Sequence, residues 1–333
     1  MDQGISVHVA GRILISLIAT SASLFASGLG APALASPEIV RGADRFEFTY
    51  KVTLPEIKGT GRLWVPLAGS DAFQTVEVEK VSAPGEWKPL TDPDYQNKIL
   101  YLAAGPAESG KVLEVRYRVT RLEKEAYPAT DESKLRRELG SERLVPVNDR
   151  FREIATEATA GKLTALERGR ALYLHVLDRM RYDKTGTGWG NGDALWACDS
   201  RTGNCTDFHS YFIALARSIG IPARFAIGAT IPAGKTDGEI SGYHCWAEFS
   251  ADGRWIPVDI SEADKHPELA EYYFGHHPAN RFELSRGRDL VVEPAPTSGP
   301  INFMAYPLLE VEGKVIRPET VLSFRRVEEH PSM

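Results

Sequence analysis

The chain has 333 residues, of which 43% are hydrophobic and 25% are charged, and its net charge is −6. This composition is ordinary for a globular protein that buries its core without disulfide staples, and the length suggests about two domains. Acidic and basic residues are interspersed and no run is rich in Lys or Arg, so we do not expect nucleic acid as a partner.

The first 35 residues have the pattern of a secretory signal. Arg12 ends a weakly basic stretch, the segment from Ile13 to Leu29 is apolar or small, and Ala33-Leu34-Ala35 resembles a cleavage site. A retained membrane anchor is the alternative, but Gly and Pro interrupt the apolar run. We therefore expect residues 1–35 to be a signal peptide and the mature protein to be exported, to a periplasmic or extracellular space. We expect no stable membrane insertion after cleavage.

Residues 36–125 are predicted to form a β-sandwich. Several short runs alternate in polarity or are rich in β-branched and aromatic residues, among them FEFTYKV, RLWVPL, TVEVEKV, KILYLAA and VLEVRYRV. Turn residues such as Lys58-Gly59 and Pro84-Gly85 separate them, which predicts antiparallel strands packed as two layers. A charged linker over 126–147 follows, and a second domain is predicted over 148–333.

Two helices are predicted at the start of this second domain. Asn148-Asp149 can cap a helix that runs to Glu157, and apolar residues recur at helical spacing from about Thr164 to Met180. The glycine-rich stretch TGTGWGNG comes next. A helix rather than a strand precedes it, so a phosphate-binding loop is not indicated.

Cys205 is predicted to lie at the first turn of a further helix. Gly203-Asn204 is a turn and N-cap signal, and Gly220 is a stop signal. Between them, one buried face is indicated by Phe208, Tyr211, Phe212, Leu215 and Ile219. Free N–H groups and the helix dipole at this place lower the pKa of a thiol, and the amide of Cys205 can donate to an oxyanion. Taken alone, a free cysteine is more often a small buried side chain than a nucleophile.

His244 and Asp259 are predicted to face one another across a β-hairpin. YHCWAEF alternates as a strand, and WIPVD reads as the strand that returns. A loop at Ser250–Gly253 pairs Phe249 with Arg254, and this register places His244 opposite Asp259. Each of the two residues has an ordinary structural interpretation. Together, downstream of a cysteine at a helix start, they predict a thiol, a base and an orienting carboxylate.

The segments GNCTDFHSYFIALARSIGIPAR, YHCWAEF and GRWIPVDISEA resemble the Cys, His and Asp motifs of the transglutaminase-like superfamily. Its members include transglutaminases, peptide N-glycanases and bacterial cysteine peptidases. The resemblance implies an α+β fold with a papain-like core, in which the helix bearing the cysteine packs on an antiparallel sheet. In the chain this core is preceded by the N-terminal β-sandwich. It also implies catalytic roles for Cys205, His244 and Asp259.

The family often supplies a second oxyanion donor upstream of the thiol, which makes Trp196 and Trp189 candidates, with core packing as the alternative for both. His209, on the same helix face as Cys205, is interpreted as a structural hydrogen-bond partner.

Three cysteines in an exported protein suggest one disulfide and one free thiol. Cys245 is expected to point away from His244. A Cys198–Cys245 disulfide would leave Cys205 free, whereas a Cys198–Cys205 bridge would lock it.

No spacing typical of a zinc or calcium site is present, so we expect no metal and no cofactor. The predicted reaction is acyl transfer from an amide carbonyl of a peptide or protein substrate, through a thioester at Cys205. Hydrolysis by a peptidase or amidase is our first interpretation. Protein crosslinking by amine transfer is the enzymatic alternative, and a non-catalytic peptide-binding envelope module is the alternative from another class.

Overall fold

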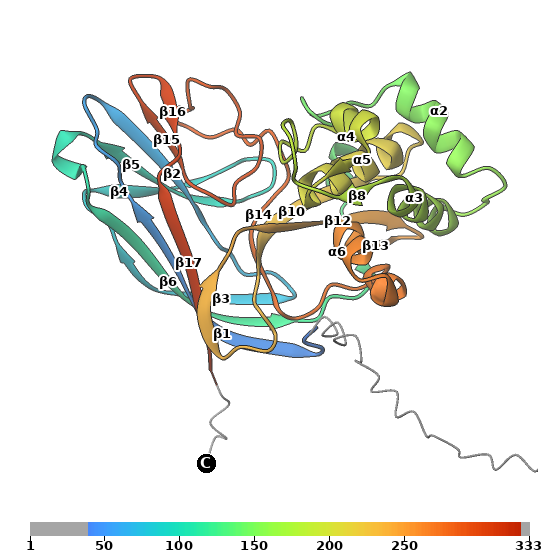
Figure 1. Ribbon diagram of the computed structural model, residues 1–333, viewed down its shortest axis with the longest axis horizontal. Coiled ribbons are helices and arrows are strands. Elements are labelled where there is room, and N and C mark those ends of the chain that lie inside the picture. Colours follow the sequence, from blue (N-terminus) through green and yellow to red (C-terminus); the bar gives the residue numbers. More distant parts are fainter. Residues whose placement is uncertain (1–38, 328–333) are drawn as a thin grey trace, which may run out of the picture. The chain divides into compact units, whose positions relative to one another are not determined.

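The computed structural model describes residues 39–327. The predicted signal peptide, residues 1–35, lies outside the described residues. Within the described part of the chain, strands gather at one end and helices cover a further sheet at the other (Figure 1). No helix in this part is long and apolar enough to cross a membrane.

Two antiparallel five-stranded sheets build the strand-rich end. The first has the order β11-β17-β1-β6-β3, with bounds β11 (Asp237–Ile240), β17 (Glu319–Arg326), β1 (Ala43–Thr53), β6 (Val112–Leu122) and β3 (Gln74–Ser82). The second has the order β16-β15-β2-β5-β4, with bounds β16 (Lys314–Ile316), β15 (Leu308–Val311), β2 (Gly61–Leu67), β5 (Lys98–Ala104) and β4 (Trp87–Thr91). Buried side chains of both sheets, such as Phe48, Leu63, Leu102 and Phe324, belong to one hydrophobic core.

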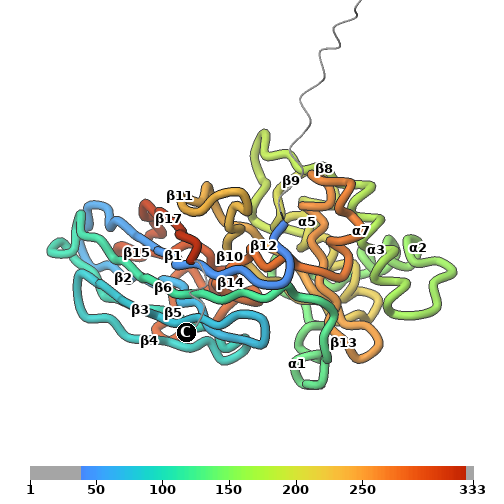
Figure 2. The backbone as a smooth tube through the Cα atoms, turned by 90° about the horizontal axis from the view of Figure 1, so that it is seen from below, coloured from blue at the N-terminus to red at the C-terminus, as the bar shows by residue number. Residues whose placement is uncertain are grey.

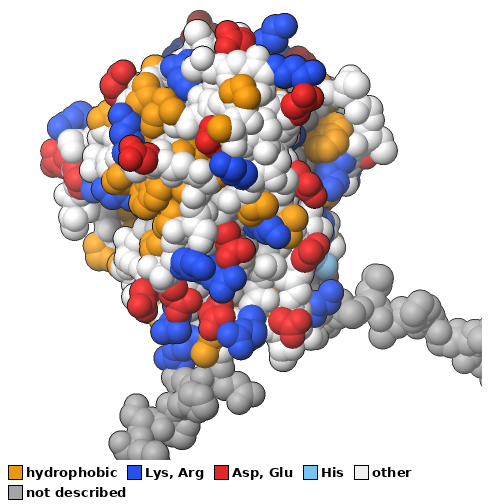
Figure 3. Space-filling model, turned by 90° about the vertical axis from the view of Figure 1, so that its left-hand side faces the viewer, with side chains coloured by type: hydrophobic (Ala, Val, Ile, Leu, Met, Phe, Trp, Pro, Cys, Tyr) orange, Lys and Arg blue, Asp and Glu red, His pale blue; other side chains and the backbone are white. Residues whose placement is uncertain are grey.

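The strand-rich end is not made by residues 36–125 alone, which differs from the sequence prediction. β17 pairs with β1 and β15 pairs with β2, so strands assigned to the second domain complete both sheets. Figure 2 shows these C-terminal strands beside the N-terminal ones. A strand at the edge of a sheet has a row of unpaired backbone N–H and C=O groups. β1 and β2 would each have such an edge, and the C-terminal strands pair with it. Figure 3 shows acidic and basic side chains interspersed over the surface of this end.

The third sheet is also antiparallel and has the order β14-β10-β12-β13-β7. Its bounds are β14 (Arg281–Arg286), β10 (Ala223–Thr230), β12 (His244–Ala251), β13 (Arg254–Val258) and β7 (Tyr127–Pro128). The helices are α1 (Glu132–Arg137), α2 (Asp149–Ala158), α3 (Ala165–Arg179), α4 (Ala194–Ser200), α5 (Cys205–Ser218), α6 (Ile260–Lys265) and α7 (Ala270–Tyr273). Short 3-10 turns η1 (Pro106–Glu108) and η2 (Pro267–Leu269) and a parallel pair, β8 (Arg181–Tyr182) with β9 (Thr202–Gly203), complete the set.

The predicted helix starts are confirmed. Asn148, Thr164 and Asn204 cap α2, α3 and α5, each through a side-chain oxygen that accepts a backbone N–H of the first turn. The expectation of a single buried face on α5 is wrong, because all of its residues are buried. α2, α3, α4 and α6 contact it on one side, and β10 and β12 on the other. The thiol helix is therefore the centre of this half of the protein.

The hairpin between β12 and β13 has a tighter turn than predicted. Ala251 pairs with Arg254 and Phe249 pairs with Ile256, so the turn consists of Asp252 and Gly253, both with positive φ. Asp-Gly is the preferred pair for such a turn. In the predicted register Phe249 pairs with Arg254, whereas in the structure its partner lies two residues further along the chain, at Ile256. Side chains alternate with a period of two, so every side chain keeps its expected face.

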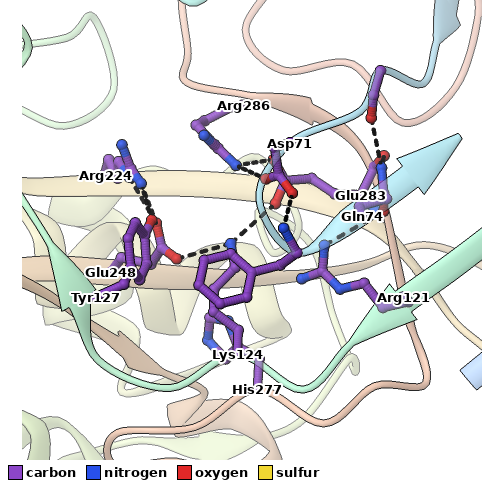
Figure 4. A network of polar contacts seen from close by, with 12 residues as sticks. Asp71, Gln74, Arg121, Lys124, Tyr127, Arg224, Glu248, His277, Glu283 and Arg286 are labelled. Atoms are coloured by element: carbon purple, nitrogen blue, oxygen red, sulfur yellow. Dashed lines mark hydrogen bonds and ion pairs between the residues drawn. The ribbon is translucent and has the colours of Figure 1, made fainter. Parts of the chain in front are cut away.

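A polar network that is mostly buried, with Asp71 as its exposed member, includes Glu248 of β12 (Figure 4). Its charged members are Asp71, Arg121, Lys124, Arg224, Glu248, Glu283 and Arg286. The ammonium of Lys124 lies 3.0 Å from the carboxylate of Glu248, and both side chains are almost fully buried. Arg224 also donates to Glu248 at 2.7 Å. Because Lys124 follows β6 and Glu248 belongs to β12, the network joins the first sheet to the sheet that carries His244.

Candidate active site

Cys205 is the first residue of α5, and its side chain is buried. Two interactions define this helix start: Asn204 Oδ1 accepts from the amide of Thr206 at 2.9 Å, and Asp207 Oδ2 accepts from the amide of Asn204 at 3.0 Å. The amide N–H of a first helical residue has no acceptor within its helix. It is therefore available to a developing oxyanion.

His244, at the start of β12, lies between Cys205 and Asp259. Its Nε2 is 2.7 Å from Oδ2 of Asp259, which leaves Nδ1 for the hydrogen bond between the imidazole and the thiol of Cys205. All three side chains are buried, with Asp259 fully so and His244 6% exposed. The structure thus brings the three predicted residues into one line of contacts, although the hairpin register differs from the predicted one.

The electrostatics of this line favour a thiolate beside an imidazolium. Burial raises the pKa of the Cys205 thiol, but hydrogen bonds with Cys245 and His244 and the charge of His244 outweigh it, so the pKa lies well below its ordinary value. Burial lowers the pKa of His244, but the carboxylate of Asp259 outweighs burial and raises this pKa to about 9. At neutral pH the proton therefore resides on the imidazole.

Asp259 is the N-cap of α6 rather than a strand-edge charge. Its Oδ1 accepts from the Ser261 hydroxyl and from the Glu262 amide, both at 3.1 Å. On the other oxygen, the guanidinium of Arg281 donates at 3.0 Å. Burial raises the pKa of Asp259, but His244 and Arg281 outweigh it and hold the pKa well below its ordinary value.

Arg281 was not found by the sequence analysis. It is 1% exposed and also donates to the hydroxyl of Thr230 at 3.0 Å. It lies on β14, far along the chain from the His and Asp motifs, and no local signal distinguishes it from other arginines. β14 reaches Asp259 only because this strand pairs with β10, which pairs in turn with β12.

His209 has the structural role that the sequence analysis gave it. Its Nδ1 lies 2.7 Å from the carbonyl oxygen of Cys205, and its Nε2 accepts from the amide of Ile260 at 3.1 Å. Burial lowers its pKa. A neutral His209 therefore ties the thiol helix to the segment that carries Asp259.

The cysteine predictions need correction. Cys198, Cys205 and Cys245 are all free thiols, so no Cys198–Cys245 disulfide is present. Cys198 lies beside Arg150, 3.5 Å from its guanidinium. Cys245, expected to point away from the site, hydrogen bonds with Cys205 and lies 3.7 Å from Nδ1 of His209. The reason is that this face of β12 packs on α5, at the turn where Cys205 begins the helix.

Neither tryptophan is brought to the thiol by any contact within the described part. The indole N–H of Trp189 donates to the carbonyl of Gly186 at 3.2 Å. Trp196, on α4, is partly buried against the core and lies over Gly188, where a Cβ would come within 2.4 Å of its Nε1. Both side chains thus shape the glycine-rich loop. No group of three or more metal-binding side chains is found among residues 39–327.

Residues 152–260 match the family model described as the transglutaminase-like superfamily. An uncharacterized protein of Haemophilus influenzae is 32% identical over a stretch that covers 44% of this chain and 49% of that protein. The chain therefore spans about half the length of the curated relative that it matches.

Among solved structures, a candidate cysteine protease from Cytophaga hutchinsonii has a TM-score of 0.61 at 15% identity, over 87% of this chain and 93% of that one. The periplasmic domain of TgpA from Pseudomonas aeruginosa has a TM-score of 0.36 at 18% identity, over 71% of this chain and 92% of that one. The first likeness shows a shared mixed fold with antiparallel sheets. The family match itself is confined to residues 152–260, the segment that contains Cys205, His244 and Asp259.

Proposed function

We propose that this protein is an exported thiol enzyme that acts on amide bonds of a peptide or protein through a thioester at Cys205. The observation that carries the proposal is the continuous contact from the Cys205 thiol to His244 and from His244 to Asp259 at 2.7 Å. The charge states of Cys205 and His244 fit this reaction. The thiolate is the nucleophile, and the imidazolium holds the proton that the leaving amine will need.

In the acylation step, the Cys205 thiolate attacks the amide carbonyl, and the S–C bond forms as the carbonyl oxygen becomes an oxyanion. The amide of Cys205 donates to that oxyanion. Collapse expels the amine, which takes its proton from His244 and leaves a thioester. The neutral imidazole then removes a proton from water, the resulting hydroxyl attacks the thioester, and the thiolate departs beside a restored imidazolium. Asp259 stabilises the imidazolium at both stages.

Hydrolysis is the version that we propose, because water is present wherever the protein is exported and no described feature marks a lysine-binding acceptor site. Amine transfer uses the same thioester with an amine in place of water. Incubating the enzyme and a glutamine-containing protein with a fluorescent primary amine separates the two: release of peptide fragments or ammonia without label supports hydrolysis, and stable labelling of the protein supports transfer.

The thiol–imidazole pair is tested by alkylation with iodoacetamide across a pH series, followed by peptide mapping. The thiolate displaces iodide, so the rate at Cys205 reports its ionisation. We expect Cys205 to react at a pH well below the ordinary thiol pKa of about 8.5, and the His244→Ala variant to need a higher pH. Cys198, in the same digest, is the internal comparison for a buried thiol outside the proposed site.

An inert Cys205, or a His244→Ala variant with the wild-type pH profile, would overturn the enzymatic proposal and leave the non-catalytic peptide-binding module. Export is tested separately, by the N-terminal sequence of the protein recovered from the periplasm or the medium. A protein that retains residues 1–35 and stays inside the cell contradicts export without affecting the chemistry.

A further inference from the structure

A groove with a volume of about 500 Å³ has Tyr243 in its lining. One wall is formed by the glycine-rich loop at Trp189 and Gly190 and by Tyr243, the other by residues between Ile301 and Leu308, and Val315 and Arg317 also line the groove. Tyr243 directly precedes His244 in the chain. One residue of the lining is therefore the chain neighbour of the proposed base.

Hydrogen bonds connect this wall to the thiol helix. Asn204, which precedes Cys205, donates from its side chain to the Tyr243 hydroxyl at 2.9 Å. The amide of Gly190 donates to Asp207 Oδ2 at 2.7 Å, on the first turn of α5. Two residues that line the groove, Tyr243 and Gly190, are thus hydrogen-bonded to the start of the helix that carries the thiol.

Both walls are held in place by one buried guanidinium. Arg288, 2% exposed, donates to the carbonyl of Gly192 at 2.7 Å and to that of Asn191 at 3.1 Å. It also donates to the side chain of Asn302, whose amide in turn donates to Asn191 at 2.9 Å. Gly192 allows this approach, because a Cβ there would lie 2.8 Å from Arg288. The groove is therefore preformed, which lowers the entropy lost when it binds a ligand.

The lining of the groove is mainly aromatic and aliphatic, and it contains one cation, Arg317. The ring of Tyr243 lies 6.1 Å from that of Phe303 and 5.7 Å from that of Tyr306. Val315, two positions before Arg317 and also in the lining, is 54% exposed although it is apolar. Arg317 is exposed and forms no ion pair within residues 39–327. Aromatic walls suit a large apolar side chain, and an unpaired guanidinium suits a carboxylate.

We propose that this groove is the substrate-recognition subsite, and that it selects peptides with a large apolar side chain next to an acidic residue. This inference rests on the proposed function, because it takes Cys205 as the reacting atom. It adds the class of substrate, which the triad alone does not define.

The probes are peptidyl chloromethyl ketones, which alkylate Cys205 as the thiolate displaces chloride and a thioether forms. Acetyl-Glu-Phe, acetyl-Glu-Ala and acetyl-Gln-Phe chloromethyl ketones differ only in the two features of interest. Each rate is divided by the iodoacetamide rate of the same protein, which removes differences in thiol reactivity. We expect Phe to be favoured over Ala by at least about tenfold, and Glu over Gln by about threefold.

Two substitutions separate the two features. Val315→Trp fills the groove and should bring the Phe-to-Ala ratio close to one, whereas Val78→Trp, at a similarly exposed valine on β3 (46%), should keep the wild-type ratio. Arg317→Gln should remove the preference for Glu and keep that for Phe. Equal rates for Phe and Ala, at a Cys205 that reacts readily with iodoacetamide, overturn the subsite and leave the triad standing. A Cys205 inert to iodoacetamide overturns both.

Discussion

Replacing Asp259 by Asn isolates the charge of the proposed orienting carboxylate. Asn is nearly isosteric and is itself a good N-cap, so α6 should keep its start at Ile260. The change removes the negative charge 2.7 Å from His244 Nε2 and leaves Arg281 without its carboxylate. Both effects act on the same imidazole in the same direction.

The magnitude follows from the pKa of His244, which the Asp259 carboxylate raises from 6.5 to about 9 against the opposing effect of burial. That difference corresponds to about 3 kcal/mol in favour of the imidazolium. Without the carboxylate, burial and the Arg281 charge both lower the pKa, so His244 becomes neutral at pH 7. The thiolate then loses its cationic partner, and alkylation of Cys205 at about pH 6 should fall by about a hundredfold.

The assay is iodoacetamide labelling of Cys205 from about pH 5 to about pH 10, read by mass spectrometry. Asp193→Asn is the matched control, because Asp193 caps α4 through two backbone amides and has no histidine or arginine partner among residues 39–327. Unpaired Arg281 should also lower the unfolding free energy by about 3–5 kcal/mol. The double variant Asp259→Asn with Arg281→Met should regain stability without regaining alkylation.

A folded Asp259→Asn variant with the wild-type pH profile at Cys205 would refute the reasoning, since the charge on the carboxylate would then have no part in holding the imidazolium. If Asp259→Asn and Asp193→Asn slowed the alkylation of Cys205 equally, the effect would be assigned to helix capping.

Three further outcomes are expected. Acyl transfer should be greatest between the lowered pKa of Cys205 and about pH 9, the pKa of His244. Above about pH 9 the imidazole no longer holds the proton that the leaving amine needs. A rate that keeps rising beyond about pH 10 would therefore contradict the assignment of His244 as the proton donor. Cys245→Ala removes a hydrogen bond that lowers the pKa of Cys205 and should slow alkylation near pH 6 by about tenfold; an unchanged rate in the same labelling assay would show that Cys245 is not a donor. Gly228→Ala places a Cβ 1.8 Å from the Phe282 carbonyl oxygen, between β10 and β14. It should lower stability by about 3 kcal/mol or more, whereas Gly69→Ala, with open space around it, should change stability by less than about 1 kcal/mol; equal melting temperatures for the two would refute the clash.

The features that could be predicted are those set by neighbours in the chain. The N-cap at Asn204 depends on a few consecutive residues, and so does the helix start at Cys205. The relation of His244 to Asp259 survived an error in the turn, because the error moved the register by two positions and preserved the face. An error of one would have separated them.

The features that were missed depend on contacts between distant segments. Arg281 reaches Asp259 only through the pairing of β14, β10 and β12, and no local pattern encodes that order. The approach of Cys245 to Cys205 depends on how closely α5 packs on β12. The strands that complete the first two sheets lie at the opposite end of the chain from their partners, and alternation alone does not say which strands will pair.

The position of β1 has a consequence for the order in which the protein assembles. Phe46 pairs with Val119 of β6 on one side and with Arg326 of β17 on the other. While the chain is being made, β6 is available long before β17, so β1 spends that interval with one row of backbone N–H and C=O groups unpaired. Closing the sheet requires a contact of very long sequence separation, and such contacts form slowly. During that interval the exposed edge can accept a strand from another nascent chain or from a chaperone.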